Sequence, residues 1–262
     1  MIFSSVSSYV QNFINPIINI SIIYFLPTYF QACKGASPIH GGIDILGLSL
    51  SLGPTLIVTG ASITITKKYR QPLWLGWCFL TAAVGSMATL HADTPLSHSV
   101  VFSLLSGLGT GMLYSATYFP VLAPLPISEN AHALAFFSFC RSFAAVWGVT
   151  VGTAVLQTQL TKRLPAEFLE QFPGGVELAY SAIPVIGTLS EPLQSQVQEA
   201  FAESIIVIWQ VMTGICGIGI VASFFMKALP LHTQIDEKWG LEANGRASDE
   251  HTQASDFLET AN

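Results

Sequence analysis

Six long runs without a charged side chain decide what this chain can fold into. Each run contains at least 20 residues with no Asp, Glu, Lys or Arg: residues 1–33, 45–66, 71–92, 94–128, 142–161 and 204–226. A helix needs about 20 apolar residues to cross roughly 30 Å of hydrocarbon. Because every backbone polar group in lipid must be paired within the protein, such runs form helices and not open sheets. The sequence therefore predicts an all-α membrane protein with six transmembrane helices.

Composition agrees with a membrane protein. Charged residues make up 10% of the chain and hydrophobic residues 51%, whereas soluble domains contain about 25% charged residues. The lipid bilayer is therefore an expected partner of this chain. The basic residues are too few and too scattered to bind nucleic acid.

The turn-like breaks between the apolar runs give the expected domain organisation. A membrane domain covering 1–230 is predicted to hold spans at about 9–32, 43–66, 71–91, 97–120, 131–160 and 200–226. The fifth and sixth spans are joined by one long extracellular loop, 161–199, whose end begins the last helix as an amphipathic extension. Residues 231–262 are polar and charged, so they cannot bury enough surface to offset ordering entropy and are predicted to be a disordered tail.

The distribution of basic residues predicts the orientation. Six spans place both termini on the same side, and six of the ten basic residues lie on that side: Lys67, Lys68, Arg70, Lys227, Lys238 and Arg246. By the positive-inside rule, both termini and the loop containing Lys67 are expected in the cytosol. An alternative role for Lys67, Lys68 and Arg70 is a cytosolic latch between the second and third spans.

Two of the predicted helices have a polar face. Asn12, Asn15 and Asn19 are spaced three and four residues apart, so they share one face of the first helix. In the fourth helix a similar row of Ser and Thr residues leads to Tyr114, with Tyr118 close by. Unpaired amides facing lipid would each cost several kcal/mol, so these faces should look into protein or water. They are either interhelical hydrogen-bond contacts or the lining of a solute path.

Two charges are isolated within or beside apolar runs. Arg141 lies in an otherwise uncharged stretch of about thirty residues, and is either an anchor at the inner membrane boundary that reaches water or a gating or coupling charge that faces a part absent from this chain. Asp44 lies at the outer end of the second span. It is either an ordinary acid near a helix N-terminus, favoured by the helix dipole, or a titrating acid.

No enzymatic or cofactor chemistry is predicted. The "GLGTGM" stretch at 107–112 has Met112 where a phosphate loop needs its third glycine. His91, Asp93 and His98 share a loop, but no further ligand completes a metal site. The four cysteines form no CxxC pair. We therefore expect no metal, no cofactor and no catalytic residues.

Three stretches resemble fungal members of the major facilitator superfamily, of the fourteen-span drug:proton antiporter, or multidrug efflux, type. They are "IYFLPTYFQACKGASPIHGGIDIL" (23–46), "SLGPTLIVTGASITITKKYRQPLWLGW" (51–77), and the segment 107–160 with its FxFxRS element at Phe137–Ser142. The likeness covers roughly residues 20–230. It implies six helices in two three-helix repeats, forming the C-terminal half of a transporter whose N-terminal half is missing from this chain.

The resemblance also implies a function. Solute would bind near the midplane between two halves, with Asn12, Asn15, Asn19, Tyr114 and Tyr118 as cavity candidates. The implied activity is proton-coupled efflux of small amphipathic compounds. The implied location is the plasma membrane or, alternatively, the vacuolar membrane. The alternatives are an uptake carrier of the same superfamily, a truncated gene product without transport activity, and a six-span channel that assembles around a pore.

Overall fold

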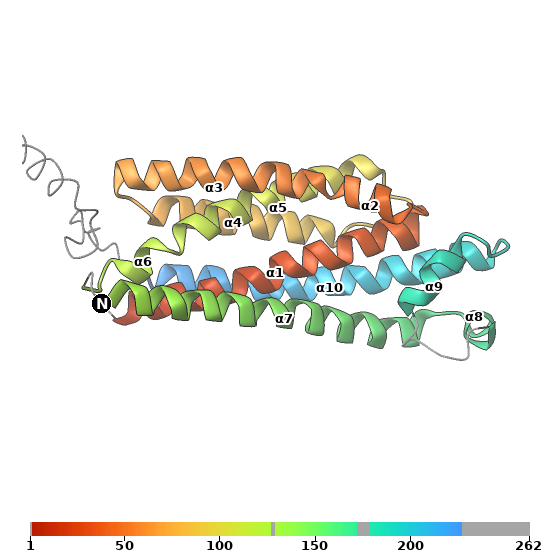
Figure 1. Ribbon diagram of the computed structural model, residues 1–262. Helices are drawn as coiled ribbons and strands as arrows, with labels where there is room; N and C mark the ends of the chain where they lie inside the picture. Colours follow the sequence, from red (N-terminus) through yellow and green to blue (C-terminus); the bar gives the residue numbers. More distant parts are fainter. Residues whose placement is uncertain (1, 127–128, 172–178, 227–262) are drawn as a thin grey trace, which may run out of the picture.

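The computed structural model (Figure 1) describes residues 2–126, 129–171 and 179–226, and these residues form helices and no strands. The helices are α1 (Ile2–Lys34), α2 (Pro38–Asp44), α3 (Leu46–Thr66), α4 (Arg70–Met87), α5 (Leu96–Ala116), α6 (Phe119–Leu122), α7 (Asn130–Arg163), α8 (Ala166–Gln171), α9 (Ala179–Ile186) and α10 (Leu193–Phe224). The predicted tail 231–262 lies outside the described residues.

Five segments are long and apolar enough to cross a membrane. They are Ser4–Lys34, Pro38–Thr66, Leu96–Leu122, Asn130–Arg163 and Leu193–Phe224. The third long helix, α4, has 18 residues, or about 27 Å at 1.5 Å per residue. It begins with Arg70, Gln71 and Pro72, which lower its mean hydropathy below that of the other five. The membrane-protein class is thus supported, whereas the sixth predicted span is not established by length and apolarity.

The long helices form an elongated bundle in which α1 is central. α1 contacts α7 and α10, α5 contacts α3 and α4, and α10 contacts α4. In the spanning window of α1, 72% of the residues are buried, against 17% in the windows of α2–α3 and of α7. Figure 1 shows α3 and α7 along opposite sides of the bundle. The two outer helices therefore present most of their apolar surface outward.

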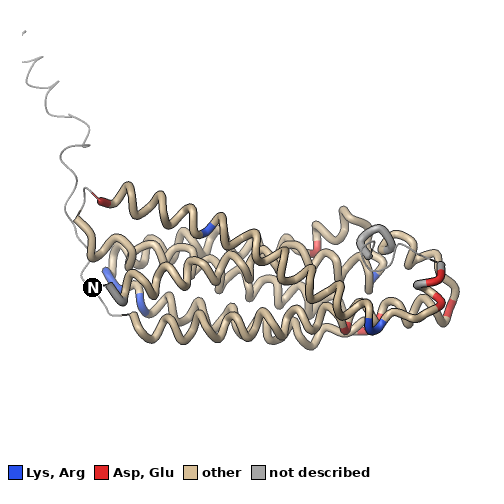
Figure 2. The backbone as a smooth tube through the Cα atoms, turned by 90° about the horizontal axis from the view of Figure 1, so that it is seen from below, with Lys and Arg blue, Asp and Glu red and all other residues tan. Residues whose placement is uncertain are grey.

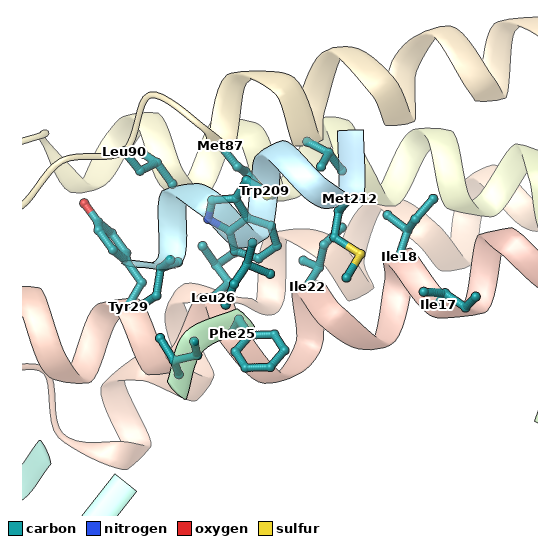
Figure 3. Packing of buried hydrophobic residues seen from close by; sticks show 14 of the residues in the cluster. Ile17, Ile18, Ile22, Phe25, Leu26, Tyr29, Met87, Leu90, Trp209 and Met212 are labelled. Carbon is teal, nitrogen blue, oxygen red and sulfur yellow. The ribbon is translucent and has the colours of Figure 1, made fainter. Parts of the chain in front are cut away.

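The apolar core lies between α1, α4 and α10. Figure 3 shows Ile18, Ile22 and Leu26 of α1 beside Trp209 and Met212 of α10, and all five side chains are buried. Burying a Leu or Ile side chain stabilises a water-soluble fold by about 1.5–3 kcal/mol, but lipid is as apolar as these side chains. Close packing is therefore what holds such a bundle together.

Glycines allow the closest helix approaches. A Cβ on Gly148 of α7 would meet the carbonyl oxygen of Ile17 in α1, and one on Gly109 of α5 would lie 2.5 Å from the backbone nitrogen of Leu80 in α4. Both obstacles are backbone atoms, which cannot rotate away as a side chain can. These two positions therefore fix the α1–α7 and α4–α5 distances.

The second predicted span, 43–66, is made of two helices that meet at Ile45. α2 begins earlier than predicted, because Pro38 occupies its first turn and the Ser37 hydroxyl accepts a hydrogen bond from the His40 backbone N–H. Gly41 and Gly42 make α2 a weak helix, and it ends at Asp44. At its other end α3 is capped by Lys67, the residue after Thr66. Lys67 has a left-handed φ of 57°, and its N–H donates to the Ile63 carbonyl.

The predicted loop 161–199 contains more helix than the hydropathy pattern suggested. It includes the last turn of α7, the short helices α8 and α9, and the beginning of α10 at Leu193. Val197, Ala200 and Phe201 are buried, and with Leu193 they follow the i, i+4, i+7, i+8 spacing of one helical face. The extension of α10 is amphipathic, so a hydropathy search locates only its apolar continuation.

Charged residues gather at the two ends of the bundle. Figure 2 shows long stretches without charge between them. We call the end that holds the first residues of α1 and the α3–α4 turn the near end, and the end that holds α2, α8 and α9 the far end (Figure 1). At the far end Arg163 pairs with Glu203 at 3.1 Å, and His91 lies 3.9 Å from Glu199.

A buried polar chain ties three helices together, and it yields a stability prediction. The Trp77 indole N–H of α4 donates to the Gln11 amide oxygen of α1 at 2.7 Å, and the Gln11 amide nitrogen donates to Ser7. Ser7 in turn donates to the Ala222 carbonyl of α10. Replacing Gln11 with Leu leaves a buried N–H without a partner, so we expect the free energy of unfolding to fall by about 1–3 kcal/mol.

Chemical or thermal unfolding of the purified chain in detergent measures this change. The double variant Gln11→Leu with Trp77→Phe removes both partners and should regain part of the lost stability. A Gln11→Leu protein as stable as the wild type would contradict the importance of this hydrogen bond.

Candidate functional site

The asparagine face of α1 looks into the bundle. Asn12, Asn15 and Asn19 are 1%, 1% and 5% exposed, in accord with the expectation that such amides avoid lipid. Their helical spacing places them on one side of α1, and two of them contact residues of α5 or α7. This face is the starting point of the candidate site.

Arg141 of α7 joins this face. Its Nε donates to the Asn12 amide oxygen at 3.2 Å, and the Asn12 amide nitrogen donates to the Phe137 carbonyl at 2.9 Å. The guanidinium carbon lies 4.4 Å from the centre of the Tyr114 ring and 5.0 Å from that of Phe137. Cation–π contacts of this kind stabilise by about 0.5–2 kcal/mol, more when water is excluded.

Tyr114 of α5 closes the group against α1. Its hydroxyl oxygen accepts a hydrogen bond from the Asn19 amide nitrogen at 3.1 Å. No acceptor for the hydroxyl hydrogen lies among the described residues. We call Asn12, Asn19, Tyr114, Phe137 and Arg141 the Arg141 cluster. It brings together three helices, α1, α5 and α7, from distant parts of the sequence.

Several polar atoms in and beside the cluster are buried and have no hydrogen-bond partner among the residues that the structure describes. They are the Nη2 of Arg141, the Oδ1 of Asn19, both amide atoms of Asn15 and the hydroxyl of Thr110. Within the described residues the only ion pairs are at the far end, so no carboxylate neutralises Arg141. Buried polar groups in folded proteins are nearly always satisfied. The cluster is therefore equipped to accept further hydrogen-bonding groups.

The remaining cavity candidates lie differently. Tyr118 is 38% exposed, and its ring meets that of Phe137 edge-on at 6.2 Å. It borders the Arg141 cluster through this contact. Ser103 and Ser106 precede Tyr114 in the polar row of α5 and donate to carbonyls of their own helix. A Cβ on Gly47 of α3 would lie 2.7 Å from the Ser103 hydroxyl oxygen. Ser103 is therefore a packing residue against α3, and neither serine bonds to the cluster.

The three basic residues of the α3–α4 turn lie at the near end. Lys67 and Lys68 are exposed, and Lys67 also supplies the left-handed residue that ends α3. Arg70 is less exposed and stacks on Trp74, with its guanidinium carbon 4.7 Å from the ring centre. Two of the three are thus free to interact with partners outside the described residues.

Asp44 lies at the other end, as the last residue of α2. It is half-buried and has no hydrogen-bond or ion-pair partner among the described residues. It precedes the first turn of α3, where the helix dipole favours a negative charge. Asp44 thus lies toward the far end, and no described contact joins it to the Arg141 cluster.

Other kinds of site receive little support from the described residues. No three or more His, Cys, Asp and Glu side chains in them lie close enough to hold a metal ion. A cavity of about 290 Å³ opens at the far end, between the end of α1 and α9, and is bordered by Gln31, Ser37 and Gln198. No charged side chain lines it, so it lacks the chemistry of the Arg141 cluster.

The sequence did not indicate the polar chain through Gln11. Its members Ser7, Gln11 and Trp77 are buried and pair with one another or with α10. The available signal was Ser8, which precedes Asn12 by four residues and donates to the carbonyl of Thr117, the residue that caps α5, at 2.6 Å. The polar face of α1 thus begins a turn earlier than the three asparagines.

Comparison with known proteins identifies the group to which this sequence is similar. No protein-family model matches the chain. It is 30% identical to "MFS transporter L2" of Phoma sp. over 92% of this chain and 41% of that protein. It is 31% identical to the efflux pump FUS6 of Gibberella moniliformis, over 89% of this chain and 42% of the pump.

A third relative is the efflux pump MMF1 of Mycosarcoma maydis, 32% identical over 90% of this chain and 38% of that protein. The chain thus spans about two fifths of the length of the curated relatives it matches. These relatives are named as transporters and pumps, not as enzymes. Together with the apolar helices they identify an integral membrane protein.

Over about nine tenths of its own length, this chain is therefore a relative of the fungal transporters and efflux pumps of the major facilitator superfamily.

Proposed function

We propose that this chain is the C-terminal half of a transporter that exports small amphipathic molecules in exchange for protons. The observation that carries the proposal is the Arg141 cluster and its surroundings. There, buried polar atoms of α1, α5 and α7 have no hydrogen-bond partner among the described residues, inside an otherwise apolar bundle. Polar and ionisable groups at such depth are characteristic of solute or ion pathways.

The pattern of helix contacts supports two three-helix repeats, one of α1, α2–α3 and α4, the other of α5, α7 and α10. If α1, α3 and α4 correspond to α5, α7 and α10, the α3–α5 contact corresponds to the α7–α1 contact, and α4–α5 corresponds to α10–α1. The α4–α10 contact then maps onto itself. Such a correspondence between the contacts of two sets of three helices is expected for inverted repeats. It makes α4 the counterpart of α10, and therefore the sixth membrane helix of the proposal.

A second half completes the mechanism. Such transporters bind solute near the midplane between two halves and expose it to each side in turn, as one half rocks against the other. Arg141 lies eleven residues into α7, or about 17 Å along the helix axis. The relatives are more than twice as long as this chain, which agrees with a second half of similar size.

We place the protein in the plasma membrane with its near end on the cytosolic side. Lys67, Lys68 and Arg70 lie at that end, and Lys34, Lys162 and Arg163 lie at the far end. The excess on the proposed cytosolic side comes from Lys227, Lys238 and Arg246, which lie outside the described residues. An excess of Lys and Arg on the cytosolic side is the usual determinant of orientation. In this arrangement protons would come from outside, where Asp44 lies within the membrane segment Pro38–Thr66 and has no ion-pair partner among the described residues.

A chimera tests the proposal. This chain replaces the segment that it matches in the Phoma sp. transporter, and the chimera is produced in yeast cells lacking their own drug pumps. We expect lower steady-state accumulation of a fluorescent amphipathic dye than in cells with an empty vector, and loss of the difference when an uncoupler collapses the proton gradient. The 262-residue chain alone should leave accumulation unchanged.

The result depends on the chimera reaching the membrane, so its abundance there is measured with an epitope tag. Normal abundance with accumulation equal to the empty vector would refute the transport proposal. Increased accumulation would indicate an uptake carrier. Lower accumulation with the 262-residue chain alone would refute the requirement for a second half.

A further inference from the structure

The Arg141 guanidinium is half-buried in the bundle and has no counter-ion among the described residues. Its neighbours are a neutral amide and two aromatic rings, and its Nη2 is buried with no hydrogen-bond partner among those residues. Removing part of an unpaired charge from water is unfavourable, and cation–π contacts offset only part of that cost. Within the described residues the site is therefore electrostatically incomplete.

The missing partner can be described from the donors that remain. Arg141 uses its Nε for Asn12, which leaves the Nη groups at the other edge of the guanidinium. The planar guanidinium fork matches the two oxygens of a carboxylate. The Tyr114 hydroxyl accepts from Asn19, so its own hydrogen is available as another donor. These donors belong to adjacent helices, and the Tyr114 ring contacts the guanidinium.

The charge count favours a single negative charge. In the described residues no other Lys or Arg contacts the cluster, since Arg70 stacks on Trp74 and Arg163 pairs with Glu203. Phosphate-like dianions are usually bound by several cations or by helix N-termini. One guanidinium and one hydroxyl suit a monocarboxylate.

We propose that Arg141, Tyr114 and Asn19 form a carboxylate-binding site, and that the solutes of this transporter include amphipathic monocarboxylic acids. The proposal rests on the proposed transport function and adds the chemical class of the solute. Arg141 binds the two carboxylate oxygens and Tyr114 donates to one of them. Asn19 is a positioning residue, because its amide holds the Tyr114 hydroxyl at 3.1 Å.

A matched pair of probes tests the site in the wild-type chain. Binding of radiolabelled octanoate and octanamide is measured on the full 262-residue chain in neutral-lipid nanodiscs at pH 7.4, with empty nanodiscs subtracted. The probes share their apolar tail and differ in charge. Charge-assisted hydrogen bonds support an affinity for octanoate about tenfold to a hundredfold higher. Equal affinities for the two probes would overturn the proposal.

Variants assign the preference to the named residues. Arg141→Gln should reduce the octanoate-to-octanamide ratio to about one, and Tyr114→Phe should lower it several-fold while keeping the ring under the guanidinium. Arg163→Gln is the matched control, since it removes an arginine from the same helix at the far end. A ratio unchanged in Tyr114→Phe and Arg141→Gln would place the carboxylate elsewhere and refute the site.

The same measurement on the chimera distinguishes two sources of carboxylate. Octanoate binding retained in the chimera assigns the site to the solute. Binding present in the isolated chain but absent from the chimera would mean that an acidic side chain of the other half occupies Arg141, and would overturn the solute assignment. Because these assays read binding, they can fail while dye export persists, and they can succeed in a protein that transports nothing.

Discussion

Replacing Gly148 with alanine is expected to destabilise the bundle by about 3 kcal/mol or more. The added Cβ would meet the Ile17 carbonyl oxygen and lie 3.2 Å from the carbonyl carbon, so α1 and α7 would have to separate. Overfilling a well-packed interior typically costs about 1–3 kcal/mol even where side chains can adjust. Here the obstacle is backbone, and the Ser21 hydroxyl also bonds to the Gly148 carbonyl at 3.0 Å.

The change is measured as the unfolding midpoint of the purified chain in detergent, followed by circular dichroism or by a thiol-reactive dye on buried Cys33 and Cys216. Gly214→Ala is the control, because a Cβ there has no atom within 4 Å. Its midpoint should be unchanged or slightly higher. Equal midpoints for Gly148→Ala and Gly214→Ala would contradict the close α1–α7 contact.

The second large effect is expected at Arg141. In the chimera, Arg141→Gln should lower the initial export rate of a carboxylate dye at least tenfold while membrane abundance stays normal. Glutamine keeps a donor for the Asn12 amide oxygen but removes the charge and the two cation–π contacts. Because the rest of the cluster holds no other cation, nothing in the described residues can replace the lost charge.

Two controls separate transport from folding. Arg163→Gln breaks an exposed ion pair of the kind that contributes about 0–1 kcal/mol, so export should remain normal. Arg141→Lys keeps the charge without the planar fork and should give an intermediate rate. Unchanged export by Arg141→Gln would indicate that the residue only anchors α7 at the membrane boundary.

Local patterns predicted some of the site but not its assembly. The spacing of Asn12, Asn15 and Asn19 was enough to place them on one buried face, because a helical face depends only on residue separation. The pairing of Asn12 with Arg141, and of Asn19 with Tyr114, depends on how α5 and α7 are placed against α1. That placement is set by contacts such as Gly148 against Ile17, which a single sequence does not specify.

The fold shows the same division. Long uncharged runs predicted the membrane helices, since crossing lipid imposes both length and apolarity. The break at Ile45 was missed, whereas the amphipathic beginning of α10 was predicted, and the helix begins at Leu193. The break depends on the capping by Ser37 and on the weak helix that follows it. Ser103 and Ser106 of α5 are buried, as the polar row predicted, but their hydroxyls bond within their own helix.

Solute exchange in proteoliposomes tests the central claim, that this chain is one working half of a transporter, most directly. The purified chimera is reconstituted into vesicles loaded with unlabelled solute, and entry of radiolabelled solute is followed beside vesicles that contain the 262-residue chain alone. We predict rapid exchange by the chimera, slowed at least tenfold by Arg141→Gln, and only the leak rate of empty vesicles with the chain alone. Exchange at the leak rate by a folded chimera would contradict the account.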